Sequence, residues 1–188
     1  MTDNKSSAIQ NNWLTKARRV PSPNKNERPE TCPVKLIIIH GISLPPNEFG
    51  GDSIEAFFTN QLDSTAHPYF KEIEGLQVSS HILIKRNGDT VQFVPFHERA
   101  WHAGVSCFKG EKDCNDFSIG IELEGADEIP YTQEQYQQLT FVCKALMKAY
   151  PELSNETIVG HCDVSAGRKT DPGESFDWPA FKSLLSRR

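Results

Sequence analysis

The sequence lacks any apolar run near the roughly 20 residues that cross a bilayer, and residues 1–10 are polar. These absences argue against a membrane span and a signal peptide, so we expect the protein to stay in the cytoplasm. Positive charge is not in excess either, because the formal net charge is −5. We therefore expect no broad basic surface for nucleic acid or for an anionic membrane.

Cysteines are few, odd in number and never spaced as C-x-x-C; the five are Cys32, Cys107, Cys114, Cys143 and Cys162. Disulfides are not required, which favours a reducing compartment. Cys162 directly follows a histidine and could be a ligand or a nucleophile. A small buried thiol is the simpler interpretation, because adjacent residues of a strand point to opposite faces.

The sequence also lacks repeats and low-complexity blocks, and its 188 residues, 37% hydrophobic and 24% charged, are typical of one globular domain. Residues 1–32 are polar, contain three prolines and show no apolar period. We predict an N-terminal arm over residues 1–32, which could hold a short helix around residues 13–19. A single domain over residues 33–188 follows it.

Four segments have strand patterns. A β-branched apolar run over residues 34–40 predicts a central strand, buried on both faces and ending at His40. Residues 117–123 alternate strictly, with Glu122 on the less apolar face. An Asn-Gly turn between residues 80–85 and 90–95 predicts an antiparallel hairpin, and residues 156–161 are typical of a short strand.

Helix signals lie between and after these strands. Asp52 or Ser53 could cap a helix that runs to residue 62, and Asp177 could cap a last helix. Thr132 and Gln135 form a capping-box pattern at the start of a long helix to about residue 150. We therefore predict the α/β or α+β class, a central mixed sheet flanked by helices.

The loop over residues 160–172 concentrates polar chemistry, and Gly167 and Pro172 make a helix across it unexpected. His40 and His161 each close a predicted strand. If those strands are parallel neighbours, the two imidazoles lie roughly 5 Å apart. Two histidines and one carboxylate suit Zn²⁺ with an open position. Without an H-E-x-x-H motif, metal-free core histidines stay an alternative, and either Asp171 or Glu122 could be the carboxylate.

Four blocks of sequence carry a family resemblance. They are His40-x-Ile-Ser-Leu-Pro-Pro-x-Glu-Phe-Gly-Gly, Arg99-Ala-Trp-His-Ala-Gly-Val, Cys114-Asn-Asp-Phe-Ser-Ile-Gly-Ile-Glu-Leu-Glu-Gly, and Gly160-His continued by Gly167-Arg-Lys-Thr-Asp-Pro-Gly. The chain resembles the zinc amidases of the N-acetylmuramoyl-L-alanine amidase 2 family over about residues 13–178. These enzymes are related in fold to bacteriophage T7 lysozyme and to peptidoglycan recognition proteins.

The resemblance implies one zinc ion bound by His40, His161 and Asp171, with Glu122 as the acid/base and Lys169 as the stabiliser of the transition state. It implies hydrolysis of the amide between the lactyl group of 1,6-anhydro-N-acetylmuramic acid and L-alanine, in cell-wall recycling. The partner is then a small anhydro-muropeptide, and we expect a monomer. From residue pattern alone, a solvated Lys169 and an exposed Glu122 are the simpler interpretations.

Trp101 and His102 are candidate walls for the sugar and lactyl group, although Trp101 could equally be a core residue. Two departures from the family concern recognition. Its members tend to carry asparagine where this chain has Gly41, and arginines where it has Gln77 and Asp113. Arginine binds carboxylates through two parallel hydrogen bonds, so the preferred stem peptide stays open.

Two rival functions compare less well with the sequence. A peptidoglycan-binding module without catalysis would lack the third ligand, whereas Asp171, Glu122 and Lys169 are all present. A lytic amidase that acts on intact wall would need export, and the sequence has no visible signal for it.

Overall fold

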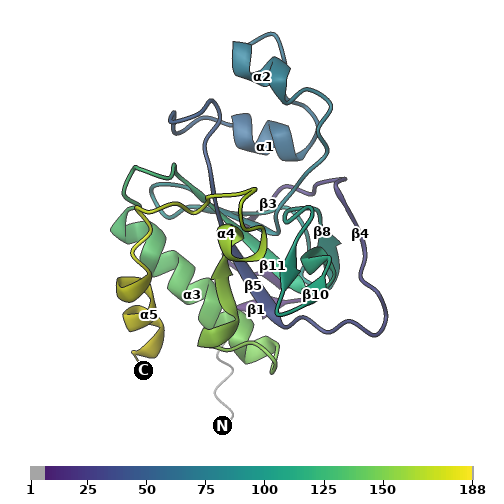
Figure 1. Ribbon diagram of the computed structural model, residues 1–188, viewed down its shortest axis with the longest axis vertical. Helices are drawn as coiled ribbons and strands as arrows, with labels where there is room; N and C mark the ends of the chain where they lie inside the picture. The colour runs from purple at the N-terminus through teal and green to yellow at the C-terminus, as the bar shows by residue number, and fades with distance from the viewer. Residues whose placement is uncertain (1–6, 188) are drawn as a thin grey trace.

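The computed structural model describes residues 7–187, and a six-stranded mixed sheet forms its centre (Figure 1). In spatial order the strands are β12 (Ile158–Gly160), β5 (Leu36–Ile42), β11 (Ser118–Glu124), β6 (Ile82–Ile84), β7 (Thr90–Gln92) and β3 (Arg18–Arg19). The first four are parallel neighbours, whereas β6 and β7 form the predicted antiparallel hairpin. No helix within residues 7–187 is long and apolar enough to cross a membrane.

Two helices cover one face of the sheet, α3 (Gln133–Ala149) and α5 (Trp178–Ser186). Both start as predicted: Thr132 and Gln135 form a reciprocal capping box, and the Asp177 side chain accepts a hydrogen bond from the Ala180 N–H. The helices pack on buried side chains of β5, β11 and β6. This layer forms the largest apolar core.

Short elements cover the opposite face: β9 (Cys107–Phe108), β10 (Glu111–Lys112), the 3₁₀ turn η1 (Cys114–Asp116) and α4 (His161–Val164). Side chains of β9, η1 and α4 pack on Leu36 and Ile38 of β5. The α/β class is therefore confirmed, with long helices on one face and short segments on the other. Strands β9 and β10 pair as a small antiparallel hairpin.

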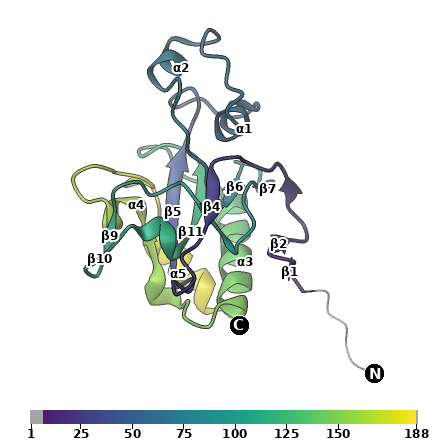
Figure 2. The same ribbon diagram turned by 90° about the vertical axis from the view of Figure 1, so that its right-hand side faces the viewer.

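Two further helices, α1 (Ser53–Phe58) and α2 (Pro68–Glu72), stand beyond the carboxyl end of β5 (Figure 2). The prediction that the first runs to residue 62 is wrong. It ends at Phe58 because Asn60 takes a positive φ of 59° and its side chain pairs with Asn24. Asp52 occupies the N-cap position, but its side chain makes no capping hydrogen bond.

The prediction of a short helix around residues 13–19 is wrong. The chain there forms a hairpin whose turn residues Asn11 and Asn12 both have positive φ, as two-residue hairpins require. Its strands are β1 (Ile9–Gln10) and β2 (Trp13–Leu14); β3 then joins the main sheet, and β4 (Lys25–Glu27) pairs with β8 (Glu98–Ala100). Residues 1–6 of the predicted arm lie outside the described residues, and the domain boundary at residue 32 stays a prediction.

Two boundaries near the polar loop also need correction. β5 continues past His40 to Ile42, because its pairing with β11 extends to Glu124. The strand expected over residues 156–161 is only Ile158–Gly160, preceded by η2 (Asn155–Thr157) and followed by α4. A short helix therefore begins the loop where none was expected, because the Asp163 carboxylate accepts a hydrogen bond from the Gly160 N–H at 2.7 Å.

Candidate metal and catalytic site

Strand register brings the two histidines together. β12 lies parallel to β5 with Gly160 opposite Ile39, so the next residue, His161, falls beside His40. Their ring centroids are 4.4 Å apart and their Nδ1 atoms 3.0 Å apart. The neighbouring-strand hypothesis made from the sequence is confirmed.

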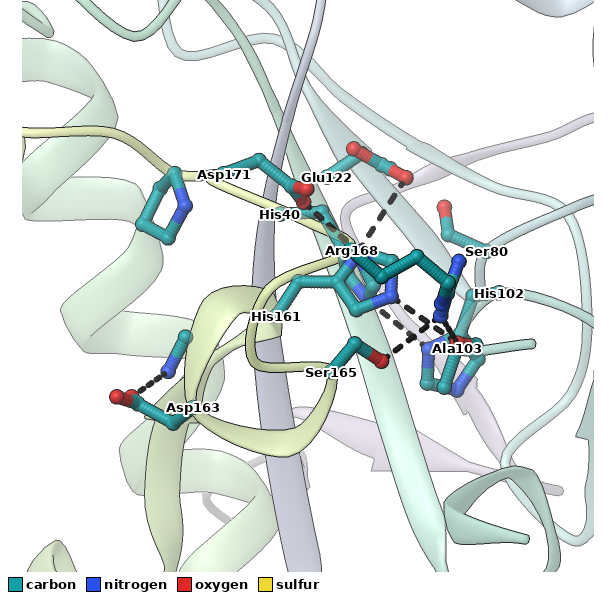
Figure 3. A network of polar contacts seen from close by, with 12 residues as sticks. His40, Ser80, His102, Ala103, Glu122, His161, Asp163, Ser165, Arg168 and Asp171 are labelled. Atoms are coloured by element: carbon teal, nitrogen blue, oxygen red, sulfur yellow. Dashed lines mark hydrogen bonds and ion pairs between the residues drawn. The ribbon is translucent and has the colours of Figure 1, made fainter. Parts of the chain in front are cut away.

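A returning loop brings Asp171 to the same point (Figure 3). The backbone N–H of Cys162 donates to the carbonyl of Asp171 at 3.0 Å, which folds the loop back on α4. The Asp171 Oδ2 atom lies 3.1 Å from Nδ1 of His161 and 3.2 Å from Nδ1 of His40. Three possible ligand atoms from distant parts of the chain thus lie within 4.8 Å of one another.

The chemistry of these three atoms fits a metal cation. Nε2 of His161 lies 3.0 Å from the Ala103 carbonyl oxygen, which can only accept, so Nε2 carries the proton. Nε2 of His40 lies 2.9 Å from Nδ1 of His102, another possible acceptor. Both Nδ1 atoms can then offer lone pairs toward the Asp171 carboxylate. Such crowded lone pairs repel one another unless a cation binds them.

The charge states suit the same interpretation. Burial lowers the pKa of His40 to about 4, although the neighbouring Asp171 carboxylate opposes the shift. Burial alone would raise the pKa of Asp171, but the adjacent imidazoles of His161 and His40 outweigh it and bring that pKa below its usual range. A neutral imidazole and an ionised carboxylate are the forms that bind metals at neutral pH.

Glu122 stands beside this cluster on β11, in register with His40. Its Oε1 lies 4.0 Å from Nδ1 of His40, farther than Asp171, and its Oε2 finds no hydrogen-bond partner within residues 7–187. Burial, and then the charge of Asp171, raise the pKa of Glu122 well above its usual value, while Lys169 opposes the shift. A buried carboxyl with a raised pKa is typical of acid/base groups.

A cavity of about 920 Å³ opens over the cluster, and Glu122, Lys169, Trp101 and His102 line it. Lys169 is exposed at its rim. Trp101 is half-buried rather than a core residue, and its indole N–H donates to the Asn26 side chain at 2.6 Å. The structure therefore brings every residue of the predicted site to one cavity.

Three other residues noted in the sequence lie elsewhere. Gln77 and Asp113 are exposed, and neither is among the described residues that line this cavity. Cys162 is half-buried and outside the group of possible ligands, and burial raises the pKa of its thiol. The structure favours the simpler interpretation of Cys162 as an inert thiol.

Sequence reasoning missed Tyr131, which supports the loop of Asp171. Its hydroxyl donates to the Pro172 carbonyl at 2.9 Å. A Cβ at Gly41 would lie 2.4 Å from that hydroxyl, and one at Gly125 would lie 2.3 Å from the ring. Gly41, noted only as a departure from the family, was the available signal, because a missing side chain beside a ligand leaves room for another group.

Comparisons with known proteins point to one family of amidases. A family profile described as N-acetylmuramoyl-L-alanine amidase matches residues 30–174. The 1,6-anhydro-N-acetylmuramyl-L-alanine amidase AmpD of Escherichia coli is 54% identical over 179 residues, which cover 95% of this chain and 97% of that protein. A crystal structure of a selenomethionine derivative of AmpD superposes with a TM-score of 0.92 at 53% identity, covering 95% of this chain and 99% of the other.

A more distant structure is that of the E. coli amidase AmiD in complex with the substrate anhydro-N-acetylmuramic acid-L-Ala-D-γ-Glu-L-Lys. It has a TM-score of 0.59 and 28% identity, and the match covers 85% of this chain and 60% of AmiD. The family profile spans most of the chain, and the match to AmpD extends over nearly all of it. The chain matches AmpD proteins over nearly its whole length, and it therefore belongs to the N-acetylmuramoyl-L-alanine amidase family.

Proposed function

We propose that this amidase uses one zinc ion to hydrolyse the amide between the lactyl group of 1,6-anhydro-N-acetylmuramic acid and L-alanine in soluble anhydro-muropeptides, a step of cell-wall recycling. The substrate is the one that the names of its AmpD relatives state. One observation carries the metal dependence: His40, His161 and Asp171 converge on one point beside a buried glutamate.

The proposed ligands of the metal are His40, His161 and Asp171, two nitrogens and one oxygen, which leaves room for water or substrate on a four-coordinate ion. Zinc bound there would lower the pKa of a coordinated water to about 7 and polarise the amide carbonyl. The protein's part is to bring the three ligands close together, and burial also favours the neutral form of His40.

Glu122 is the proposed acid/base. Its carboxylate takes the proton of the attacking water and delivers it to the nitrogen of the departing alanine. Burial raises the pKa of Glu122, and a nearby cation lowers it again. A carboxyl that is subject to both effects can accept a proton from water and donate it again.

Lys169 is the proposed stabiliser of the negative oxygen that develops on the amide carbonyl. It lies at the rim of the cavity, and its charge acts on Glu122 across it. Trp101 and His102 line the same cavity and are the proposed walls for the sugar and lactyl group. The ring of Trp101 is held by its hydrogen bond to Asn26.

Three broader expectations remain proposals of the same kind: a catalytic domain over residues 33–188 preceded by an arm, a cytoplasmic location, and a monomeric state. Cell fractionation tests the location, and light scattering of the purified protein tests the monomer. Removal of residues 1–32 tests whether the rest folds and works alone.

The central experiment measures zinc content and turnover together. Purified protein should hold one zinc per chain and release the peptide from anhydro-muropeptide, and exhaustive chelation should abolish release until zinc is restored. Glu122→Gln should keep the zinc and lose turnover, whereas the exposed matched control Glu152→Gln should keep both. Activity that survives complete removal of metal would contradict the proposal, and so would cleavage of intact sacculi but not of the soluble substrate.

A further inference from the structure

The two proposed metal-binding histidines both contact one short segment of chain, His102 and Ala103. We propose that His102 and Ala103 form an outer clamp on the metal site, in which the His102 ring accepts the Nε2 proton of His40 and the Ala103 carbonyl accepts that of His161. The inference rests on the proposed zinc site, and it makes His102 a positioning residue as well as a wall of the cavity.

The contact with His161 has only one possible direction. Its Nε2 lies 3.0 Å from the Ala103 carbonyl oxygen, so the nitrogen must donate. The ring is buried and its Nδ1 points toward Asp171. This hydrogen bond selects the tautomer whose Nδ1 carries the lone pair, which is the form a metal ligand needs.

The contact with His40 runs through a second imidazole. Nε2 of His40 lies 2.9 Å from Nδ1 of His102, and Nε2 of His102 lies 3.2 Å from the Ser118 hydroxyl. If Nδ1 of His40 is to bind metal, its Nε2 donates to His102. His102 must then carry its own proton on Nε2 and donate it to Ser118. Both ring nitrogens of His102 are thus used within the protein.

A single side-chain amide holds the clamp in place. The Asn115 Oδ1 atom accepts the backbone N–H of His102 at 3.1 Å and that of Ala103 at 2.8 Å. Asn115 is itself buried. One acceptor therefore fixes both residues that face the two histidines, so the two ligands are oriented together.

Gly120 supplies the space for the clamp. A Cβ at this position would lie 2.5 Å from Cγ and Nδ1 of the His102 ring, although the backbone of Gly120 is ordinary extended strand. The missing side chain lets the imidazole lie directly on β11, two residues before Glu122. Any larger residue there would push the ring away from His40.

The same segment also reaches the loop of the third ligand. Arg168 donates from Nη2 to the Ala103 carbonyl at 2.6 Å (Figure 3). The same nitrogen donates to the Val105 carbonyl at 2.9 Å. Arg168 lies three residues before Asp171 in the returning loop. All three proposed ligands are therefore tied to residues 102–105, although this segment contributes no metal ligand.

The test measures zinc affinity by competition with a chelator. His102→Phe removes the acceptor and should weaken zinc binding about 10–100-fold, as loss of outer-shell partners does. His102→Asn places an amide oxygen where Nδ1 was and should restore most of the affinity. Gly120→Ala, which touches neither metal nor ligand, should weaken binding by displacing the ring. His97→Phe changes an exposed histidine nearby and should leave zinc affinity unchanged.

Nitrogen-15 spectra of the zinc-loaded wild type give a readout that needs no variant: His102 should carry its proton on Nε2. The inference is overturned if the wild type binds zinc while His102→Phe and Gly120→Ala bind it equally tightly, or if His102 is protonated on Nδ1. In either case the proposed zinc enzyme stands. A wild type that binds no zinc would instead overturn both proposals.

Discussion

The two halves of the proposed metal site are built in different ways. His40 and His161 are fixed by the register of β5 and β12, and the side chains that precede His40 on β5 are completely buried. Asp171 and Lys169 come from a loop that is held by individual hydrogen bonds, such as that from Cys162 to the Asp171 carbonyl. One half depends on a core, the other on a few polar contacts.

The magnitudes show which half is weaker. Burying one aliphatic side chain contributes about 1.5–3 kcal/mol, and Ile37, Ile38 and Ile39 beneath the histidines are all 0% exposed. A hydrogen bond contributes about 0.5–1.5 kcal/mol net. We therefore expect damage to the strand half to threaten the fold, and damage to the loop half to act first on the metal and the reaction.

The largest effect should come from removing one ligand of each half. His161→Ala and Asp171→Ala should both reduce zinc content to near zero and activity below detection, a greater loss than the about 10–100-fold for outer-shell partners. The two variants should differ in the free energy of unfolding of the metal-free protein, measured with urea. His161→Ala should lower this free energy more than Asp171→Ala does, because removing the buried imidazole opens a cavity. Equal stabilities would contradict the contrast between the halves.

The next largest effect should be the loss of turnover when Glu122, the proposed acid/base on β11, is substituted. Glu122→Gln should reduce turnover about 10²–10⁴-fold, the usual worth of a general acid/base, while zinc content stays at one per chain. Single-turnover kinetics with metal analysis of the same sample would check this. Loss of zinc in this variant would instead indicate that Glu122 serves as a ligand.

The matching change on the loop half is Lys169→Ala. Removing a group that stabilises the oxyanion typically costs about 10²–10³ in kcat, and zinc affinity should hardly change because Lys169 is exposed and outside the ligand group. Lys169→Arg keeps the charge and should recover part of the loss. Unchanged kcat in Lys169→Ala would exclude it from the reaction.

The same division decided what the sequence could predict. The β-branched run before His40 and the alternation before Glu122 follow directly from burial, so both strands were found. The capping box at Thr132 and the cap at Asp177 are local signals, and both helices start where predicted. The adjacency of His40 and His161 was a hypothesis, because strand order depends on contacts 121 residues apart.

Contacts made by loops were harder to predict from the sequence. The clamp by His102 and Ala103 depends on Asn115 and Gly120, whose spacing matches no local pattern. The short helix α4 was missed because Asp163, whose carboxylate accepts the Gly160 N–H, lies inside a stretch that glycine and proline mark as irregular. The end of α1 was misplaced because Asn60 pairs with Asn24, a contact that periodicity cannot report.

A smaller effect concerns pH and the metal-free protein. Folding raises the pKa of Glu122 above its ordinary 4.5, so the folded chain keeps this proton to higher pH than the unfolded chain. Stability then falls as pH rises from about 4.5 through the raised value. Metal-free Glu122→Gln should be more stable than the metal-free wild type at pH 8 and lose that advantage toward pH 4. Thermal unfolding across this range tests it, with Glu152→Gln as the flat control.

The smallest expected effect isolates the loop half. Tyr131→Phe deletes only the hydroxyl that donates to the Pro172 carbonyl, and should lower the free energy of unfolding by about 0.5–1.5 kcal/mol. Zinc affinity should fall by a few-fold, because the carbonyl adjoins Asp171, while the strand half is untouched. Tyr150→Phe, whose hydroxyl has no hydrogen bond in the described part of the chain, is the matched control.

Gly41→Ala should displace the same hydroxyl, since its Cβ would lie 2.4 Å away. In a double-mutant cycle, the Gly41→Ala/Tyr131→Phe double variant should therefore lose less zinc affinity than the two single variants lose together. Each substitution breaks the same hydrogen bond, so the second has little left to remove. Full additivity would mean that Tyr131 does not hold the loop of Asp171. The loop half would then depend on its other contacts, such as those of Arg168 with the Ala103 and Val105 carbonyls.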